Sequence, residues 1–220
     1  MSRKHISVLV VVLILSMLVI FPAAPAHAAT ITVTSKLDTA DPGHCRLRDA
    51  IIAANTNTAT GDCPAGTAGM DTIGFSLGLQ CNLVPCVIVL TSALPAVTEN
   101  LTINGGDTTI SGANAFRVFD LDAVTAALSN LKIANANVAG SSFGGAISMS
   151  DGTLTLTNVS FSNNRAISGG AIYEAKGMLT VVNSNFSGNI AEIGDAYEGN
   201  DVPIFERPSI SVKLSALHPR

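Results

Sequence analysis

The acidic residues between positions 120 and 176 have types and spacing that could support chemistry. They are Asp120, Asp122, Asp151 and Glu174, with Lys176 following shortly after the last of them. A polysaccharide hydrolase or lyase needs paired carboxylates, or carboxylates that hold Ca²⁺ beside a basic residue, on one exposed face. A carbohydrate-active enzyme is therefore one hypothesis for this chain.

The same acidic residues also fit a simpler interpretation as solvated positions at strands and bends. No histidine lies near them, and Asp151-Gly152 is a turn signal in its own right. The sequence shows no nucleophile elbow, phosphate loop, calcium-binding nonapeptide or metal-ligand cluster. We therefore predict no catalytic residue, no bound metal and no cofactor, and we favour a role other than catalysis.

Residues 1–28 predict an export signal. Two basic residues near the start precede a nearly unbroken apolar run over residues 6–21, and Ala26-His27-Ala28 is a small-x-small cleavage site. The run is shorter than the roughly 20 residues that span a bilayer, which argues against the alternative of a membrane anchor. We expect cleavage before Ala29, no membrane span in the mature chain, and a secreted or cell-surface location.

Four cysteines lie between residues 45 and 86, and an even number of cysteines in an exported chain predicts disulfides. Sequence alone allows three pairings. We favour Cys45 with Cys63 and Cys81 with Cys86, because each bridge then closes a local loop. A zinc site is the weaker alternative, since His44 is the only imidazole nearby.

Composition and charge narrow the class of protein further. Removal of the signal leaves 10 basic and 16 acidic residues, a net charge of about −6. That balance argues against nucleic acid as a partner, because nucleic-acid binding requires a basic surface. The remaining chain has the length of one domain. Only 13% of residues are charged and tryptophan is absent, which suits a repetitive sheet better than a catalytic cleft.

One sequence pattern occurs twice in the second half of the chain. Residues 144–147 and 169–172 both have the sequence Gly-Gly-Ala-Ile, and a Phe-x-x-Asn motif follows each copy. A fixed period of about 25 residues indicates one supersecondary unit stacked on its neighbours, and alternation in segments such as 154–157 indicates strands. The sequence therefore predicts an all-β, right-handed parallel β-helix of about five coils over residues 71–200.

Each residue type in the repeat has a structural role. The glycine pairs Gly144-Gly145 and Gly169-Gly170 allow positive φ angles and close backbone approach. Phe161 and Phe186 should point inward and stack on each other. The repeated asparagines should form stacked amide ladders at the bends, Asn158 with Asn183 and Asn164 with Asn189. We favour this structural role for them over metal or sugar binding.

Residues 29–70 predict a cap in front of the array. After a strand at 31–34, an apolar stripe indicates a short helix over residues 46–54. The open end of a β-helix exposes unpaired backbone groups, and we expect the helix to cover it. Further strands are expected at 73–75, 87–90, 101–103, 109–110 and 116–121.

Residues 201–220 carry no repeat signature and are expected to form a disordered tail. A third copy begins at Gly194, but Ser211 stands where the next phenylalanine is due. Either residues 210–214 close the array as an edge strand, or the chain is a shortened piece of a longer array, and we favour the second. An open end would promote end-to-end self-association.

Two segments resemble known proteins. Residues 45–51, Cys-Arg-Leu-Arg-Asp-Ala-Ile, resemble the CSLREA motif of exported bacterial β-helix proteins, with Arg46 in place of Ser and Asp49 in place of Glu. The Gly-Gly-Ala-Ile and Phe-x-x-Asn motifs resemble the repeats of chlamydial polymorphic outer-membrane proteins, which act in adhesion. The resemblance implies a structural or adhesive module, with a surface glycan or the surface of a host or neighbouring cell as partner. The alternative is a polysaccharide lyase or glycoside hydrolase.

Overall fold

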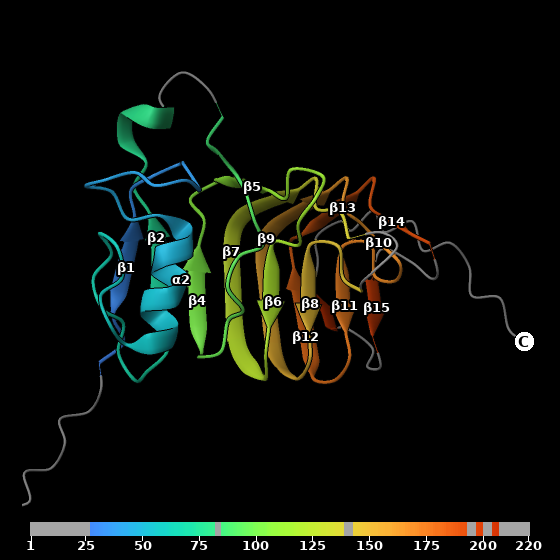
Figure 1. The fold of residues 1–220 in the computed structure, drawn as a ribbon. Coiled ribbons are helices and arrows are strands. Elements are labelled where there is room, and N and C mark those ends of the chain that lie inside the picture. The colour runs from blue at the N-terminus through green and yellow to red at the C-terminus, as the bar shows by residue number, and fades with distance from the viewer. Residues whose placement is uncertain (1–26, 82–84, 139–142, 193–196, 200–203, 207–220) are drawn as a thin grey trace, which may run out of the picture.

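The computed structural model describes residues 27–81, 85–138, 143–192, 197–199 and 204–206. Most of the expected signal segment and the expected edge strand at 210–214 lie outside these ranges. The described chain is a parallel β-helix, so the expected all-β fold class is confirmed. Its strands lie side by side from the blue N-terminal end to the red C-terminal end in Figure 1.

One long sheet runs through the whole array. Neighbouring strands in it are parallel, and their order is β1 (Thr30–Val33), β2 (Asp71–Phe75), β4 (Leu101–Asn104), β7 (Val124–Ala134), β9 (Gly152–Ser162), β12 (Met178–Val182) and β16 (Ile204–Glu206). Three short strands extend it at its bent ends: β5 (Thr109–Ser111) pairs with β7, β3 (Val87–Val89) pairs with β5, and β13 (Asn185–Ser187) pairs with β9. The long sheet and its short strands thus form two of the faces of the β-helix.

A second, four-stranded sheet forms another face. Its order is β6 (Phe119–Leu121), β8 (Ile147–Met149), β11 (Ile172–Glu174) and β15 (Tyr197–Gly199). A small pair, β10 (Arg165–Ala166) with β14 (Ile190–Ala191), lies at a corner. Four levels of the described chain therefore carry strands on both main faces. The earlier strands β1, β2 and β4 extend the long sheet, and a single bridge between Val97 and Leu121 extends the second sheet beyond β6.

The period of the sequence repeat appears directly in the strand register. Leu154 lies opposite Leu179, and Phe161 lies opposite Phe186. The preceding level is less regular, because Leu128 pairs with Leu156 across a longer offset than the one that separates Leu154 from Leu179. The regular sequence repeats thus occupy the levels whose spacing is uniform.

The core is a set of aliphatic columns inside the coils. Ile103, Leu128, Leu156 and Val181 lie opposite one another on successive levels, and each is buried. Burying one such side chain contributes roughly 1.5–3 kcal/mol. Alternation of buried and less buried residues along each strand therefore directs one face inward at every level.

The two repeat phenylalanines stack with ring centroids 4.8 Å apart and planes 11° apart. Phe161 is fully buried, whereas Phe186 is only partly buried. The expected stack is therefore present, although Phe186 is less enclosed than Phe161. The reason is its position near the end of the array, where no described aromatic ring covers its other side.

The two glycines of each pair act differently. Gly144 and Gly169 have positive φ angles of 68° and 59°, which other residues adopt only with strain. The second glycine allows close packing between coils, because a Cβ added to Gly145 would overlap the backbone oxygen of Gly170. Both expected roles of the glycine pair are therefore present.

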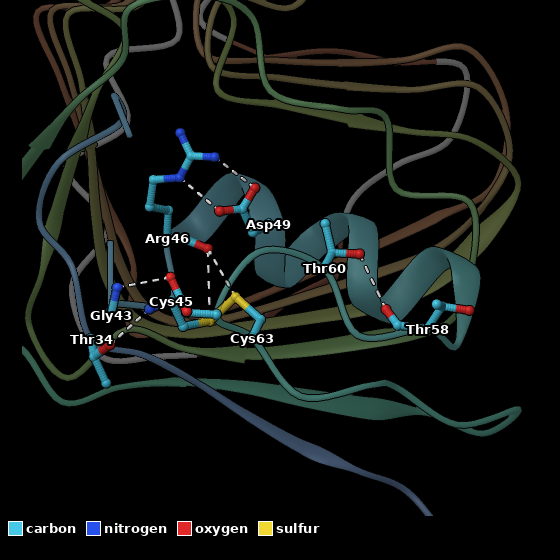
Figure 2. Close-up of a disulfide and its surroundings, with 9 residues drawn as sticks. Thr34, Gly43, Cys45, Arg46, Asp49, Thr58, Thr60 and Cys63 are labelled. Atoms are coloured by element: carbon cyan, nitrogen blue, oxygen red, sulfur yellow. Dashed lines mark hydrogen bonds and ion pairs between the residues drawn. A yellow bond between two sulfur atoms is a disulfide. The ribbon is translucent and has the colours of Figure 1, made fainter. Parts of the chain in front are cut away.

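The helix α2 (Leu47–Thr56) packs against β1 and β2 at the N-terminal end of the array (Figure 1). Its apolar side, which includes Ala50 and Ile51, joins the core. In Figure 2 the helix crosses the opening framed by the coils, as expected for a cap. The expected boundary at residue 71 differs from the structure, because β1 precedes the helix and already pairs with β2.

The strand array also extends past the expected boundary at residue 200. Strand β16 pairs in parallel with β12, with Phe205 opposite Val181. This offset is shorter than the one between Leu154 and Leu179, so the pairing departs from the period that the sequence motifs define. The remaining parts of the expected tail, residues 201–203 and 207–220, lie outside the described chain.

Asparagines form two kinds of ladder at the bends. The exposed ladder joins Asn104, Asn130 and Asn158, whose amide groups donate to one another at 3.1 Å. In the second ladder the Asn164 amide donates to Asn189 Oδ1 at 2.9 Å. Asn158 and Asn183 both adopt positive φ angles at the ends of paired strand segments, and the amide hydrogen bond of Asn158 is to Asn130. Sequence comparison of the two close repeats missed the two earlier members of the exposed ladder.

Replacing Asn164 with alanine should lower the free energy of unfolding by about 2 kcal/mol. The Asn164 side chain is buried, accepts from the Ala136 backbone nitrogen at 3.0 Å and donates to the Ile133 oxygen at 3.1 Å. Its loss leaves both backbone groups unsatisfied. Urea denaturation followed by circular dichroism measures the change. The matched control is Asn104→Ala, an exposed member of the other ladder, and equal losses in the two variants would contradict the assignment.

Candidate functional site

The acidic residues expected to matter for chemistry are spread over separate places. Asp120 points outward from β6 and pairs with Arg117 at 3.3 Å, whereas Asp122 lies beyond the end of that strand and accepts from Ser150 Oγ at 3.1 Å. Asp120 and Asp122 are both exposed on either side of the buried Leu121, so alternation leaves them on one face, but a different partner engages each carboxylate. The structure does not assemble these two carboxylates into a catalytic pair.

Asp151 forms an ion pair with Lys176 of the next coil. The Lys176 ammonium donates to Asp151 Oδ2 at 2.9 Å, and the Gly152 backbone nitrogen donates to Oδ1 at 2.7 Å. The Lys176 hydrogen bond, followed by the Gly152 hydrogen bond, lowers the pKa of Asp151 below its usual value. The carboxylate therefore stays ionised and serves as an exposed inter-coil ion pair.

Glu174 was expected at a solvated position, and that interpretation is wrong. Strand alternation along β11 directs Ile172 and Glu174 inward and Tyr173 outward. Glu174 is only 1% exposed and lies opposite Met149. It therefore belongs to the interior of the array rather than to a surface groove.

An exposed aromatic pair is the most distinctive feature of the outer surface. Phe143 and Tyr173 stack with ring centroids 4.8 Å apart and planes 23° apart. Phe143 is 49% exposed. Aromatic rings supply a flat apolar surface, and a tyrosine adds a polar tip that can form hydrogen bonds. Such a pair can hold the apolar face of a sugar ring.

Polar residues of the same sheet lie beside the aromatic pair. Asp120, Ser148 and Tyr173 are opposite one another on β6, β8 and β11, and they form one outward-facing row. Strands lie about 4.8 Å apart, so the row spans roughly the width of one or two sugar rings. Arg117 donates to the backbone oxygens of Phe143 and Gly144 at 2.7 Å and 3.0 Å. It thereby fixes the segment that carries Phe143. We call Phe143, Tyr173, Ser148 and Asp120 the aromatic row.

The N-terminal cap contains the CSLREA-like segment and the first disulfide. Cys45 is bonded to Cys63, and Cys81 is bonded to Cys86, as the spacing favoured. Figure 2 shows the first bridge at the start of α2, where the Cys45 backbone nitrogen donates to Thr34 Oγ1 at 2.9 Å. The bridge ties the loop after α2 to the residues before the helix, and the Cys45 hydrogen bond ties those residues to the end of β1. Two disulfides indicate an oxidising compartment.

Two arginine–carboxylate pairs order the CSLREA-like segment. Arg46 binds both oxygens of Asp49, at 2.7 Å and 2.9 Å (Figure 2). The Asp49 hydrogen bonds raise the pKa of Arg46 above its usual value. Arg48 binds both oxygens of Asp38, at 3.1 Å and 2.9 Å. Arg46 and Asp49, the two residues that differ from the CSLREA motif, thus form an ion pair with each other.

Asp38 joins three separate parts of the chain. Its side chain is 1% exposed, and Thr91 donates to Oδ2 through both its backbone nitrogen and its hydroxyl, at 2.7 Å and 2.8 Å. Burial raises the pKa of Asp38, but the hydrogen bonds from Arg48 and Thr91 outweigh it, so the pKa is lowered overall. Arg48 extends the network to the Ala93 backbone oxygen at 2.7 Å.

No protein-family model, curated protein or solved structure matches this chain. In the described ranges, no group of three or more His, Cys, Asp or Glu side chains is arranged to hold a metal ion. No helix in the same ranges is long and apolar enough to cross a membrane. The chemistry of the candidate site therefore has to be argued from the aromatic row itself.

Sequence reasoning missed the aromatic row. Phe143 lies just before the glycine pair, outside the repeated motif, and Tyr173 follows the second Gly-Gly-Ala-Ile copy where Ser148 follows the first. A comparison of the non-identical positions between the two repeats would have found Tyr173. Positions that differ between stacked copies are the ones free to carry function.

Proposed function

We propose that this chain is an exported β-helix protein of the cell surface or extracellular space that serves as a structural or adhesive module. The two disulfides, the signal-like residues 1–28 and the resemblance to exported surface proteins support export. The continuous core and the inter-coil ladders make a stiff support. Such a support presents its surface side chains at fixed spacing.

The aromatic row carries the proposed adhesive contact, with a glycan as its ligand. The exposed stack of Phe143 on Tyr173 provides the apolar platform, and the neighbouring Ser148 and Asp120 provide polar groups for sugar hydroxyls. Because the chain is acidic overall, neutral glycans should bind better than acidic ones in the absence of a divalent cation.

A binding screen with neutral and acidic polysaccharides, each with and without Ca²⁺, tests this proposal. We expect saturable binding of a neutral glycan, weakened at least tenfold by Phe143→Ala, which corresponds to about 1.4 kcal/mol. The matched control is Met178→Ala, because Met178 is 50% exposed on a different face and should leave binding unchanged. Equal losses in both variants, or no binding at all, would contradict the adhesive role.

The same samples separate adhesion from catalysis. An adhesive module leaves the bound polysaccharide intact. Release of reducing ends or unsaturated products during incubation would instead support the alternative of a glycoside hydrolase or a polysaccharide lyase.

A further inference from the structure

A buried carboxylate lies at the start of β2, beside the first residues of β1. Asp71 is only 1% exposed. Its Oδ1 accepts a hydrogen bond from the backbone nitrogen of Ala29 at 2.8 Å. Thr67 binds the same carboxylate through its backbone nitrogen at 3.0 Å and its hydroxyl at 2.9 Å. Asp71 thus gathers donors from two segments that are far apart in the sequence.

All of these donors are neutral in the uncleaved chain. The ion pairs found among the described residues do not include Asp71. The two arginines at the start of α2 are engaged elsewhere, Arg46 with Asp49 and Arg48 with Asp38. Strands β1 and β4 and the segment 64–70 contain no charged residue. Burial of an ionised carboxylate without a cation is unfavourable, so this site favours a positive group.

Ala29 is also the residue that cleavage of the signal would expose. Cleavage after Ala28 converts the Ala29 backbone amide into an α-ammonium group, which carries a positive charge and three N–H donors. The nitrogen lies 2.8 Å from Asp71 Oδ1 and 3.1 Å from Thr67 Oγ1. No rearrangement is needed to bring the new charge into contact with the carboxylate.

We infer that the α-ammonium group created at Ala29 forms an ion pair with the buried Asp71, which strengthens the attachment of β1 to β2 once the signal has been removed. This inference rests on the proposed export and on cleavage after Ala28. It assigns the mature N-terminus a structural role at the first level of the array. The ligand of the Asp71 site is thus a group of the chain itself.

Cleavage should also strengthen the hydrogen bond between Thr67 and Asp71. In the uncleaved chain the Thr67 hydroxyl lies 2.6 Å from the His27 backbone oxygen and 2.9 Å from Asp71 Oδ1. Once His27 is removed, the Thr67 hydroxyl can donate its proton to Asp71 alone. The Thr67 hydroxyl oxygen continues to accept a hydrogen bond from the nitrogen of Ala29. Cleavage therefore gives the Asp71 carboxylate a positively charged partner at Ala29 and a Thr67 hydroxyl donor that is no longer shared with His27.

The site is closed around the carboxylate, which strengthens an ion pair formed there. A Cβ added to Gly66 would overlap Asp71 Oδ2 and would lie 2.8 Å from the Ala53 backbone oxygen. Gly66 therefore packs closely between the carboxylate and the backbone of α2. Such a water-poor setting increases the attraction between opposite charges.

A thermodynamic cycle tests the ion pair. Three forms of the chain are compared: one that begins with a free amine at Ala29, one that is acetylated there, and one with a single added glycine. The added glycine keeps the Ala29 amide donor but moves the charge away. At pH 6.5 we expect both modified forms to have a folding equilibrium constant at least tenfold lower than the free-amine form. Asp71→Asn should abolish that difference, whereas a difference of the same size in the variant would overturn the inference.

The pH dependence provides a second measurement that needs no Asp71 variant. Pairing with Asp71 raises the pKa of the α-amino group above its usual value of about 8. The added stability is therefore fully present below pH about 8 and is lost as the pH rises through the higher pKa of the folded state. The acetylated chain should lack this alkaline loss. Identical pH profiles for the free and acetylated forms would overturn the inference.

N-terminal sequencing of the exported protein separates this inference from the proposed function. A start at Ala29 together with the measured coupling supports both. A start at another residue overturns the ion pair in the natural protein but leaves export intact. Absence of the protein from the exported fraction would overturn the export proposal, whereas the prepared chains would still measure whether Asp71 binds an amine at Ala29.

Discussion

Replacing Phe161 with alanine should lower the free energy of unfolding by about 3–5 kcal/mol. Phe161 is fully buried and contacts two levels of the array, since it lies opposite Ile133 on one side and Phe186 on the other. Its removal leaves a cavity between coils whose backbones are held by parallel strand pairing. Urea denaturation followed by far-ultraviolet circular dichroism measures the change.

Phe186 provides the matched control for Phe161. It has the same repeat position and the same ring stack, but it is only partly buried. The same substitution at Phe186 should therefore cost about 1–2 kcal/mol. If Phe186→Ala costs as much as Phe161→Ala, the stack is uniformly buried and the array continues over Phe186.

Replacing Asp38 with alanine should lower the free energy of unfolding by about 3 kcal/mol, because it leaves a largely buried arginine without its partner. The side chain of Arg48 is 18% exposed, whereas that of Asp38 is 1% exposed. The change also removes the acceptor for both donors of Thr91. The control is Asp151→Ala, which breaks an ion pair whose two side chains are 43% and 76% exposed and should leave the unfolding midpoint unchanged.

The pH dependence of the Asp38 network follows from the direction of its pKa shift. The pKa of Asp38 is lowered in the folded state. Its contribution to stability is therefore present above the unfolded value of about 4 and is lost as the pH falls through the lower folded value. The difference in stability between the native chain and Asp38→Ala should shrink below pH about 4. A difference that stays constant down to pH 2 would contradict the assignment.

The parts of the fold that could be predicted from the sequence are those with a repeated local cause. The Gly-Gly-Ala-Ile copies, the Phe-x-x-Asn motif and the apolar stripe of α2 each impose a backbone geometry or a buried face. The strand pairing of the irregular levels was harder to predict. Strands β1 and β2 pair with Ile31 opposite Ile73, although the whole cap lies between them in the sequence. No periodicity within the sequence indicates a pairing across so long an insertion.

The candidate site could not be predicted, for a different reason. The aromatic row combines residues from β6, β8, β11 and the segment before Gly144, so it depends on the lateral register of separate coils. The same holds for Asp71, whose partners Thr67 and Ala29 meet only because β1 lies next to β2. Alternation along β11 also decides that Tyr173 faces outward and Glu174 inward. Residue type alone favoured the opposite for Glu174.

The glycine contact between Gly145 and Gly170 determines how such a molecule can change its length. The Cβ-free surface of one coil faces the backbone of the next, and Gly170 in turn faces the backbone of Ile190. Duplication of a whole repeat unit would place a new glycine at each of these contacts and keep every column aligned. Insertion of a single residue within a strand would turn the downstream side chains to the opposite face. Growth by gene duplication in whole units is thus compatible with the packing, and a tandem copy of residues 154–178 should yield a longer molecule with the same cross-section.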